Sequence, residues 1–170
     1  LLELNEKYKF IKKTTNLLDL GSCPGGWSQI SSKIIAKGKI LSIDLKKMDE
    51  IKNVSFLQCD FLDFETKDKI LRFFGQKLDV ILSDIAADTT GNKSLDCIRT
   101  NQICIDVVNF SSKILKPNGV LVTKLFMGED FLEVKKLAKN KFKKVQFFKP
   151  EASRDESKET YLHCSILNTL

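Results

Sequence analysis

Four polar side chains each follow a short apolar run, and their types suit the binding of a nucleoside and the handling of a proton. Asp44 and Asp60 end two successive runs, and Asp84 and Lys124 end two later ones. A carboxylate can accept hydrogen bonds from both hydroxyls of a ribose, which suits the position of Asp44, and Asp60 could hold an adenine amino group. Each acid taken alone could equally be a loop or helix-cap residue, so the prediction depends on their placement in series.

Lys124 lies between Val122-Thr123 and Leu125-Phe126, so we expect its ammonium group to be partly desolvated. Desolvation disfavours the charged form and would lower the pKa of Lys124. Such a lysine can act as a base, or as a cation that stabilises a developing negative charge. The alternative is that Lys124 pairs with a nearby carboxylate in a structural ion pair.

A loop with three glycines joins an apolar run to an amphipathic segment. The run Leu17–Leu20 leads into GSCPGGW (21–27), and a helical pattern follows at once. Glycines let the backbone approach a ligand closely, and the start of a helix offers free N–H groups. The dinucleotide spacing G-x-G-x-x-G is absent, which favours a nucleoside-like ligand and argues against a nicotinamide-dependent oxidoreductase. A tight structural turn is the alternative.

The elements that position these residues alternate along the chain, which is typical of a parallel sheet covered by helices on both faces. We predict strands over 17–20, 40–43, 54–58, 79–82, 119–124, 144–148 and 160–167. We predict helices over 27–36, 65–74, 95–115 and 129–140. The last two strands lie close together in the sequence without a helical pattern between them, so they should pair antiparallel.

The predicted fold class is therefore α/β, with a doubly wound, mostly parallel seven-stranded sheet and an antiparallel C-terminal strand. We expect a single domain over residues 1–170, since this length supports one sizeable core. The carboxyl ends of parallel strands meet at one edge, where ligands bind in such sheets. The polar side chains that follow the strands should therefore converge on one crevice.

The composition favours an anionic partner. A net charge of +6 and a pI near 9.0 favour nucleic acid, although a general excess of lysine would produce the same charge. The five cysteines form no C-x-x-C pair and the chain has one histidine, so we expect no metal and reduced, intracellular thiols. No apolar run approaches the roughly 18–20 residues that cross a bilayer, so we expect no membrane partner.

Five stretches resemble, in order, the motifs of the FtsJ-like (RrmJ-like) RNA ribose 2′-O-methyltransferases. They are DLGSCPGGWSQ (19–29), FLQCDF (56–61), LSDIAA (82–87), LVTKLF (121–126) and KPEASRDESKETY (149–161). The resemblance covers nearly the whole chain and is greatest to the large-subunit ribosomal RNA enzymes of bacteria and mitochondria, the uridine branch. It implies a Rossmann-like fold that binds S-adenosylmethionine and methylates a ribose 2′-hydroxyl of ribosomal RNA.

The resemblance also implies roles for individual residues, matched motif by motif. The catalytic residues would be Lys124, Asp84 and Glu159. The residues at the cofactor would be Gly21, Pro24, Gly25, Gly26, Trp27, Asp44, Leu45, Asp60, Phe61 and Asp84. The residues that face RNA would be Lys149, Arg154 and Lys158.

The sequence departs from the family pattern at two places. Ala87 stands where the family usually has a proline, which loosens the loop after Asp84 but removes no functional group. The family's first catalytic lysine precedes a helix that corresponds to Leu1–Leu4, so we expect the natural protein to continue upstream and to carry a lysine there. A cofactor-binding RNA chaperone or ribosome assembly factor with little catalysis is therefore an alternative, and a tRNA 2′-O-methyltransferase is another.

We expect a monomer inside the cell, in the cytoplasm or in an organelle such as the mitochondrion.

Overall fold

A seven-stranded sheet forms the centre of the computed structural model, which describes residues 1–128, 130–151 and 159–168. The strands lie in the order β3-β2-β1-β4-β5-β7-β6. They are β1 (Leu17–Leu20), β2 (Ile40–Asp44), β3 (Ser55–Gln58), β4 (Leu78–Ser83), β5 (Leu115–Phe126), β6 (Phe142–Phe148) and β7 (Glu159–Leu167). Strands β1 to β5 pair in parallel, whereas β7 is antiparallel to both β5 and β6. The predicted fold class, including the antiparallel C-terminal strand, is confirmed.

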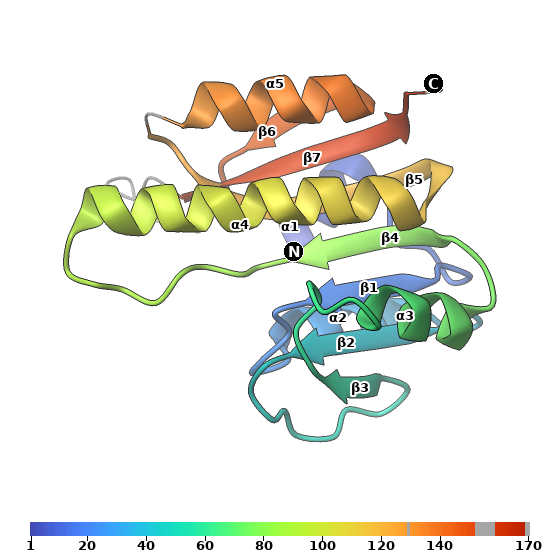
Figure 1. Cartoon of the computed structure of the whole chain (residues 1–170). Coiled ribbons are helices and arrows are strands. Elements are labelled where there is room, and N and C mark those ends of the chain that lie inside the picture. The colour runs from blue at the N-terminus through green and yellow to red at the C-terminus, as the bar shows by residue number, and fades with distance from the viewer. Residues whose placement is uncertain (129, 152–158, 169–170) are drawn as a thin grey trace.

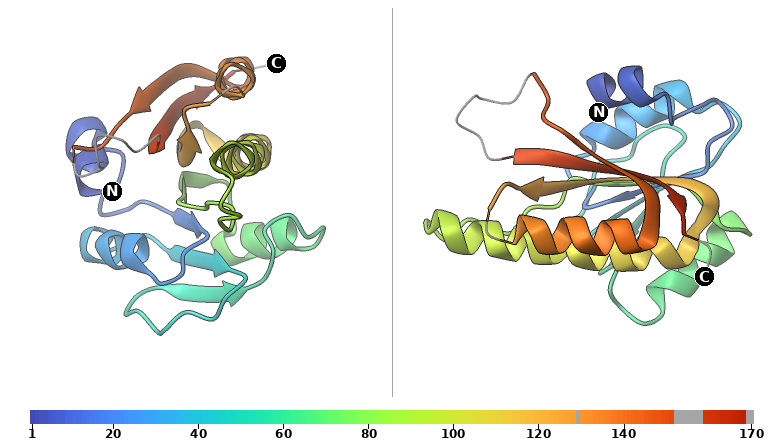
Figure 2. Two further views of the ribbon diagram at one scale, coloured as in Figure 1. Left: turned by 90° about the vertical axis from the view of Figure 1, so that its left-hand side faces the viewer. Right: turned by 90° about the horizontal axis from the view of Figure 1, so that it is seen from above.

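Helices cover both faces of the sheet (Figure 1). Those in the described part of the chain are α1 (Leu2–Tyr8), α2 (Gly26–Ile34), α3 (Thr66–Phe74), α4 (Lys93–Ile114) and α5 (Phe131–Lys141). Figure 2 shows α1 and α2 on one face and α3, α4 and α5 on the other. The periodic pattern predicts all of them except α1, because seven residues with one buried side chain, Leu4, give no periodicity to detect.

The junction between α4 and β5 shows how local sequence sets the element boundaries. Asn92 caps α4, because its side-chain oxygen accepts hydrogen bonds from two backbone N–H groups of the first turn. The helix ends at Ile114, and β5 begins with the next residue. Strand β5 starts earlier than the predicted 119, because Leu115 already pairs with Leu78 and a register shift follows.

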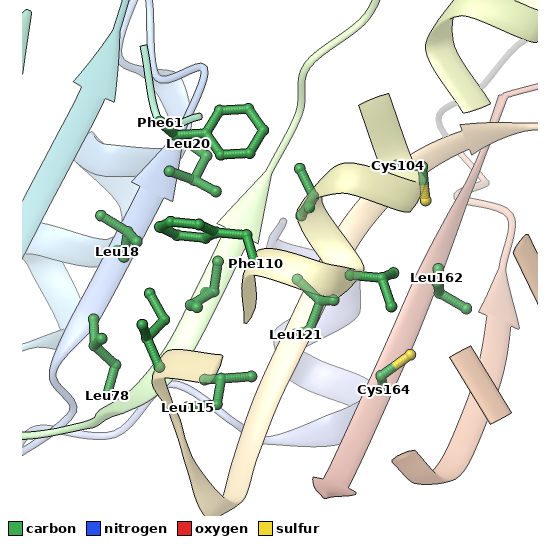
Figure 3. Close-up of a cluster of buried hydrophobic side chains, with 14 of the residues drawn as sticks. Leu18, Leu20, Phe61, Leu78, Cys104, Phe110, Leu115, Leu121, Leu162 and Cys164 are labelled. Carbon is green, nitrogen blue, oxygen red and sulfur yellow. The ribbon is translucent and has the colours of Figure 1, made fainter. Parts of the chain in front are cut away.

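The core has one cluster of apolar side chains on each face of the sheet, because successive side chains of β1 point to opposite faces. Leu18 and Leu20 pack on the face of α3, α4 and α5, whereas Leu17 packs on the face of α1 and α2. Figure 3 shows part of the larger cluster, in which side chains of the central strands meet Phe110 and Cys104 of α4. Both faces of β1 are covered, so its residues are all buried, as is usual in parallel sheets.

The cysteines belong to this packing. All five are free thiols, and Cys97, Cys104 and Cys164 are buried. Buried thiols of this kind behave as small apolar side chains. Within the described ranges, no group of three or more potential ligands could hold a metal ion. In the same ranges, no helix is both long and apolar enough to cross a membrane.

Candidate active site

A cavity of about 650 Å³ opens at the carboxyl-terminal edge of the parallel strands. The last residues of β2 and the residues just after β1, β2, β3 and β4 form its wall, together with Arg99, Gln102 and Ile103 from α4. Six of the ten residues that the sequence assigns to a cofactor lie on this wall: Gly21, Asp44, Leu45, Asp60, Phe61 and Asp84. The parallel order β3-β2-β1-β4 brings them together, because it ends four neighbouring strands at one edge.

Gly21 is the point where the loop after β1 passes the cavity. Its φ is +69°, a left-handed conformation that favours glycine, and a Cβ there would lie 2.2 Å from Ile85 Cγ1. The N–H groups of Gly21 and Ser22 donate to the Ile43 carbonyl at 2.8 and 3.2 Å. Only glycine therefore allows the loop to run this close to Ile85 on the wall.

Four later residues of the glycine loop do not line the cavity, although Cys23 does. Pro24, Gly25, Gly26 and Trp27 are not part of its wall. Gly25 is buried where a Cβ would lie 2.7 Å from Ile51 Cδ1, so its small size serves packing. The Trp27 ring packs on Tyr161 with ring centroids 5.4 Å apart. These four residues shape the loop and the start of α2, and a direct contact with a cofactor stays a prediction.

Asp44 is held with both carboxylate oxygens oriented by the backbone. Its Oδ2 accepts a hydrogen bond from the Cys23 N–H at 2.9 Å, and its Oδ1 accepts one from the Lys46 N–H at 2.7 Å. A carboxylate offers about four lone-pair sites, so acceptor capacity remains for a ligand. The first bond also ties the end of β2 to the glycine loop.

The segment after β3 supplies one polar and one apolar part of the wall. Asp60 Oδ1 accepts a hydrogen bond from the Leu62 N–H at 2.9 Å, which closes a tight turn. Phe61 is 9% exposed and meets Phe110 edge to face, with ring centroids 5.5 Å apart. Phe61 therefore anchors this turn in the core while part of its side chain lines the cavity.

Lys124 joins two carboxylates in a cluster beside the cavity. Its Nζ lies 2.9 Å from Asp84 Oδ1 and 3.1 Å from Glu159 Oε1. The Tyr161 hydroxyl bridges the same two oxygens, at 2.8 Å from Asp84 and 2.9 Å from Glu159. The structure thus brings the three residues predicted to be catalytic into direct contact and adds Tyr161. Only the place of Tyr161 inside the last motif could have drawn attention to it.

The sheet register creates this cluster. Lys124 on β5 pairs with Tyr161 on β7, and Phe126 pairs with Glu159. Asp84 follows the last paired residue of β4, which is the parallel neighbour of β5 on the other side. Side chains that are far apart in the sequence therefore meet because β5 lies between β4 and β7.

The pKa of Lys124 lies above its ordinary value, so the predicted lowering is wrong. Burial does lower this pKa, since the side chain is only 14% exposed, but the negative charges of Asp84 and Glu159 and their hydrogen bonds outweigh burial. Lys124 is therefore an ammonium ion at neutral pH. The pKa of Tyr161 is also raised, first by burial and then by the same carboxylates, so its hydroxyl keeps its proton.

A further acid near the site, Asp19 of β1, was missed by sequence reasoning. It is 1% exposed and accepts a hydrogen bond from Ser28 Oγ at 2.5 Å, and Ser28 in turn lies 2.6 Å from Ser42 Oγ. Burial raises the pKa of Asp19 to about 7. The signal in the sequence is an acid within an otherwise apolar strand, since such an acid needs a buried polar partner.

The predicted RNA-facing residues are only partly described. Lys149 is exposed just after β6. Arg154 and Lys158 lie outside the described residues. A basic edge made by these three residues therefore stays a prediction.

Solved structures with the same fold include methyltransferases. A protein from Plasmodium falciparum, assigned as a ribosomal RNA methyltransferase, superposes with a TM-score of 0.85 at 30% identity, over 98% of this chain and 93% of that one. Human methyltransferase-like protein 13 in complex with SAH superposes with a TM-score of 0.65 over 90% of this chain and 72% of that one. Its 18% identity shows a shared fold and nothing finer.

Sequence comparison places the chain in one family. Ribosomal RNA large subunit methyltransferase E of Pelagibacter ubique is 44% identical over 167 residues, which cover 98% of this chain and 82% of that protein. The protein of the same name from Rickettsia akari is 42% identical over 168 residues, covering 95% and 74%. The model of the FtsJ-like methyltransferases matches residues 1–166. The chain therefore belongs to the family of FtsJ-like methyltransferases.

Proposed function

We propose that this chain methylates the ribose 2′-hydroxyl of a uridine in large-subunit ribosomal RNA, with S-adenosylmethionine as the methyl donor. The main observation behind this proposal is the cluster of Lys124, Asp84 and Glu159, which holds a largely buried lysine side chain beside a cavity of cofactor size. The names of the Pelagibacter and Rickettsia relatives support large-subunit ribosomal RNA as the substrate. Uridine, as the nucleoside, rests on the motif resemblance.

The cavity suits S-adenosylmethionine in size and in chemistry. Its volume of about 650 Å³ lies within the range of roughly 300–1,000 Å³ for small-molecule sites. Asp44 and Asp60 line the cavity, and carboxylates there suit ribose hydroxyls and an adenine amino group. When bound there, the cofactor supplies a sulfonium methyl group that an oxygen nucleophile can attack.

Lys124 is the group that acts on the RNA hydroxyl in this proposal. An ammonium group has three N–H donors. Among the described residues, Asp84 and Glu159 take two of them, so one is left for the ribose oxygen. That hydrogen bond would stabilise the alkoxide that forms when the ribose hydroxyl gives up its proton to solvent water, and a preorganised donor of this kind contributes about 10²–10³-fold in rate. The two carboxylates and Tyr161 keep the ammonium in place.

The RNA strand is proposed to run along the edge that carries Lys149, Arg154 and Lys158. Each of these side chains would neutralise one phosphate, and releasing one counterion changes the slope of log affinity against log salt by about 0.7–0.9. Neutral substitutions at the three positions, one at a time, should each reduce the slope by that amount. An unchanged slope in all three variants would contradict this edge.

The test of the proposed function is to map ribose methylation in large-subunit ribosomal RNA. Ribosomal RNA from cells without the protein is methylated in vitro with the wild type, with Lys124→Met, or with Lys136→Met on the exposed face of α5 as a control. A 2′-O-methyl group blocks alkaline cleavage of the next phosphodiester bond, so one protected uridine should appear with the wild type and the control only. Methylation of a base, or equal methylation by Lys124→Met, would overturn the proposal. Improved subunit assembly without methylation would favour the assembly-factor alternative.

A further inference from the structure

A second cavity, of about 450 Å³, lies at the opposite edge of the sheet from the active site. The segment after α1 forms one side of it, and the first residues of β4 and β5 form another, with Asp79 and Lys116 on the wall. We call it the amino-edge cavity, because it lies where β4 and β5 begin. Asp79 on its wall lies five residues before Asp84 along β4, which corresponds to roughly 17 Å of extended chain. It is therefore distinct from the site described above.

The amino-edge cavity carries an excess of positive charge. Lys9, Lys12 and Lys116 contribute to its wall, and Asp79 is its one carboxylate among the described residues. Both oxygens of Asp79 are already engaged: Oδ1 lies 2.7 Å from Lys116 Nζ, and Oδ2 accepts a hydrogen bond from the Asn16 N–H at 2.8 Å. In the described part of the chain, no carboxylate lies within ion-pair distance of Lys9 or Lys12. Two positive charges on this wall are thus not balanced locally.

The segment that carries these lysines is fixed in place. Lys9 adopts a left-handed conformation with φ of 51° at the end of α1. The Ile11 N–H donates to Asn5 Oδ1 at 2.8 Å, and the Lys12 N–H donates to Thr15 Oγ1 at 2.8 Å. Thr15 is buried and returns a hydrogen bond to the Lys12 carbonyl at 3.1 Å. The backbone of the wall is therefore preorganised, which reduces the entropic cost of binding a ligand.

His163 adds polar groups without partners to the same wall. It is 5% exposed, and neither of its ring nitrogens has a hydrogen-bond partner among the described residues. Tyr8 stacks on its ring at 4.1 Å, and Phe10 packs on it at 5.8 Å. Buried polar atoms are usually paired, so an unpaired imidazole beside a cationic cavity points to a missing ligand. The Thr14 and Ser165 hydroxyls on the wall are further donors.

We propose that the amino-edge cavity binds a phosphate group. A phosphate carries a charge of about −1 to −2 and accepts hydrogen bonds on several oxygens, which matches two unbalanced ammonium groups and a rim of hydroxyl donors. A cation would be repelled by the lysines. The phosphate can belong to the RNA backbone or to a small phosphorylated molecule, and the experiment separates these sources.

The first measurement titrates the full chain with inorganic pyrophosphate and follows the backbone amide signals of Thr14, Thr15 and Asn118 by NMR. Saturable shifts confined to this cavity are expected. The variant with Lys9→Gln and Lys12→Gln should bind pyrophosphate at least about tenfold more weakly, because it loses two charge-assisted contacts. The control combines Lys67→Gln on α3 with Lys136→Gln on α5, both exposed, and removes the same net charge.

The second measurement compares the salt dependence of ribosomal RNA binding between the two double variants. If the phosphate belongs to RNA, the slope of log affinity against log salt should fall by about 1.4–1.8 in Lys9→Gln/Lys12→Gln relative to the control. Equal slopes together with lost pyrophosphate binding would assign the cavity to a small phosphorylated molecule. If pyrophosphate shifts no amide of the cavity, or shifts them equally in both double variants, the proposal is overturned. Neither readout uses methyl transfer, so the result is independent of the proposed function.

Discussion

The chemistry at the residue scale depends on the charge of Lys124. The sequence predicts a lowered pKa for Lys124 and leaves open whether it acts as a base or as a cation, but the carboxylates of Asp84 and Glu159 raise that pKa. An ammonium group cannot accept the proton of a hydroxyl, so its contribution has to be electrostatic. In the proposed reaction, the cluster would therefore stabilise negative charge on the ribose oxygen. The ion pairs of Lys124 with Asp84 and Glu159 would then hold the ammonium group in place for that role.

Replacing Lys124 with methionine should lower the rate of methyl transfer and leave cofactor affinity nearly unchanged. Lys124 contacts Asp84 and Glu159 and is not part of the cavity wall, whereas losing its donor at the reacting oxygen should cost at least about 10²-fold in kcat. Single-turnover kinetics and calorimetry with S-adenosylmethionine measure the two effects. Loss of cofactor binding together with activity would indicate a structural role for Lys124.

Asp44 should contribute to cofactor affinity. Asp44→Ala removes a carboxylate that lines the cavity with acceptor capacity left, so S-adenosylmethionine should bind more weakly by about 1.5–3 kcal/mol, as expected for hydrogen bonds to a charged group. Glu133→Ala, at an exposed position of α5, removes the same charge away from the cavity wall and serves as the control. If calorimetry gave both variants the affinity of the wild type, Asp44 would not belong to the cofactor site.

The loop between β4 and α4 is positioned, at the element scale, by hydrogen bonds to the helix. The Ala87 N–H donates to Thr100 Oγ1 at 3.1 Å, and the Thr90 N–H and hydroxyl donate to Asp96 Oδ1 at 2.8 and 2.7 Å. The hydrogen bonds from Thr90 keep the pKa of Asp96 below its ordinary value. A proline at position 87, as in the resembled family, would have no N–H to donate. The bond to Thr100 therefore restrains a loop that a proline would otherwise stiffen.

Thr100→Val tests this restraint with little change in shape. Thr100 is fully buried whereas Ala87 is half-buried, so the variant loses the hydrogen bond of the Ala87 N–H and should lower the free energy of unfolding by about 0.5–1.5 kcal/mol. The loop lines the cavity, so the KM for S-adenosylmethionine should also rise. Urea unfolding and steady-state kinetics measure these effects. Thr89→Val, at an exposed position of the same loop, should change neither, and a Thr100→Val protein equal to it would contradict the restraint.

Two buried titratable groups act on the whole molecule in opposite directions as pH changes. Burial raises the pKa of Asp19 to about 7, so between about pH 4 and 7 the folded state keeps a proton that the unfolded state releases. Its contribution to stability is therefore lost as pH rises through this window. Burial lowers the pKa of His163 to about 4, so its contribution is lost as pH falls from about 6.5 to 4.

Asp19→Asn should remove the first effect and leave the second. Relative to the wild type, the free energy of unfolding of this variant should rise between pH 4 and 7 by up to roughly 4 kcal/mol, the equivalent of about three pKa units. Urea unfolding at several pH values measures the difference, with Asp49→Asn at an exposed position as the control. A difference that stays constant with pH would show that Asp19 is ionised in the folded protein.

The pKa of His163 can be measured separately. The chain has one histidine, so its NMR signal reports the pKa of His163 directly.

The sequence by itself determined the sheet and the edge where the site lies. Short apolar runs separated by amphipathic segments indicate parallel strands between two layers of helices. Four polar side chains then share one edge because each lies at or near the carboxyl end of a strand: Asp44, Asp60, Asp84 and Lys124. Local turn chemistry also marks the glycine loop. These features depend on residues that are near one another in the chain, which is why a sequence pattern can contain them.

Only the tertiary structure decided which side chains meet. The place of β5 between β4 and β7 sets Glu159 and Tyr161 against Lys124, and with them the charge of that lysine. It also directs Trp27 onto Tyr161, away from the cavity wall, and assembles the amino-edge cavity from the segment after α1 and the first residues of β4 and β5. These contacts join residues that are distant in sequence. A local pattern cannot predict the order of the strands, because the hydrophobic periodicity of a strand is the same whichever neighbour it pairs with.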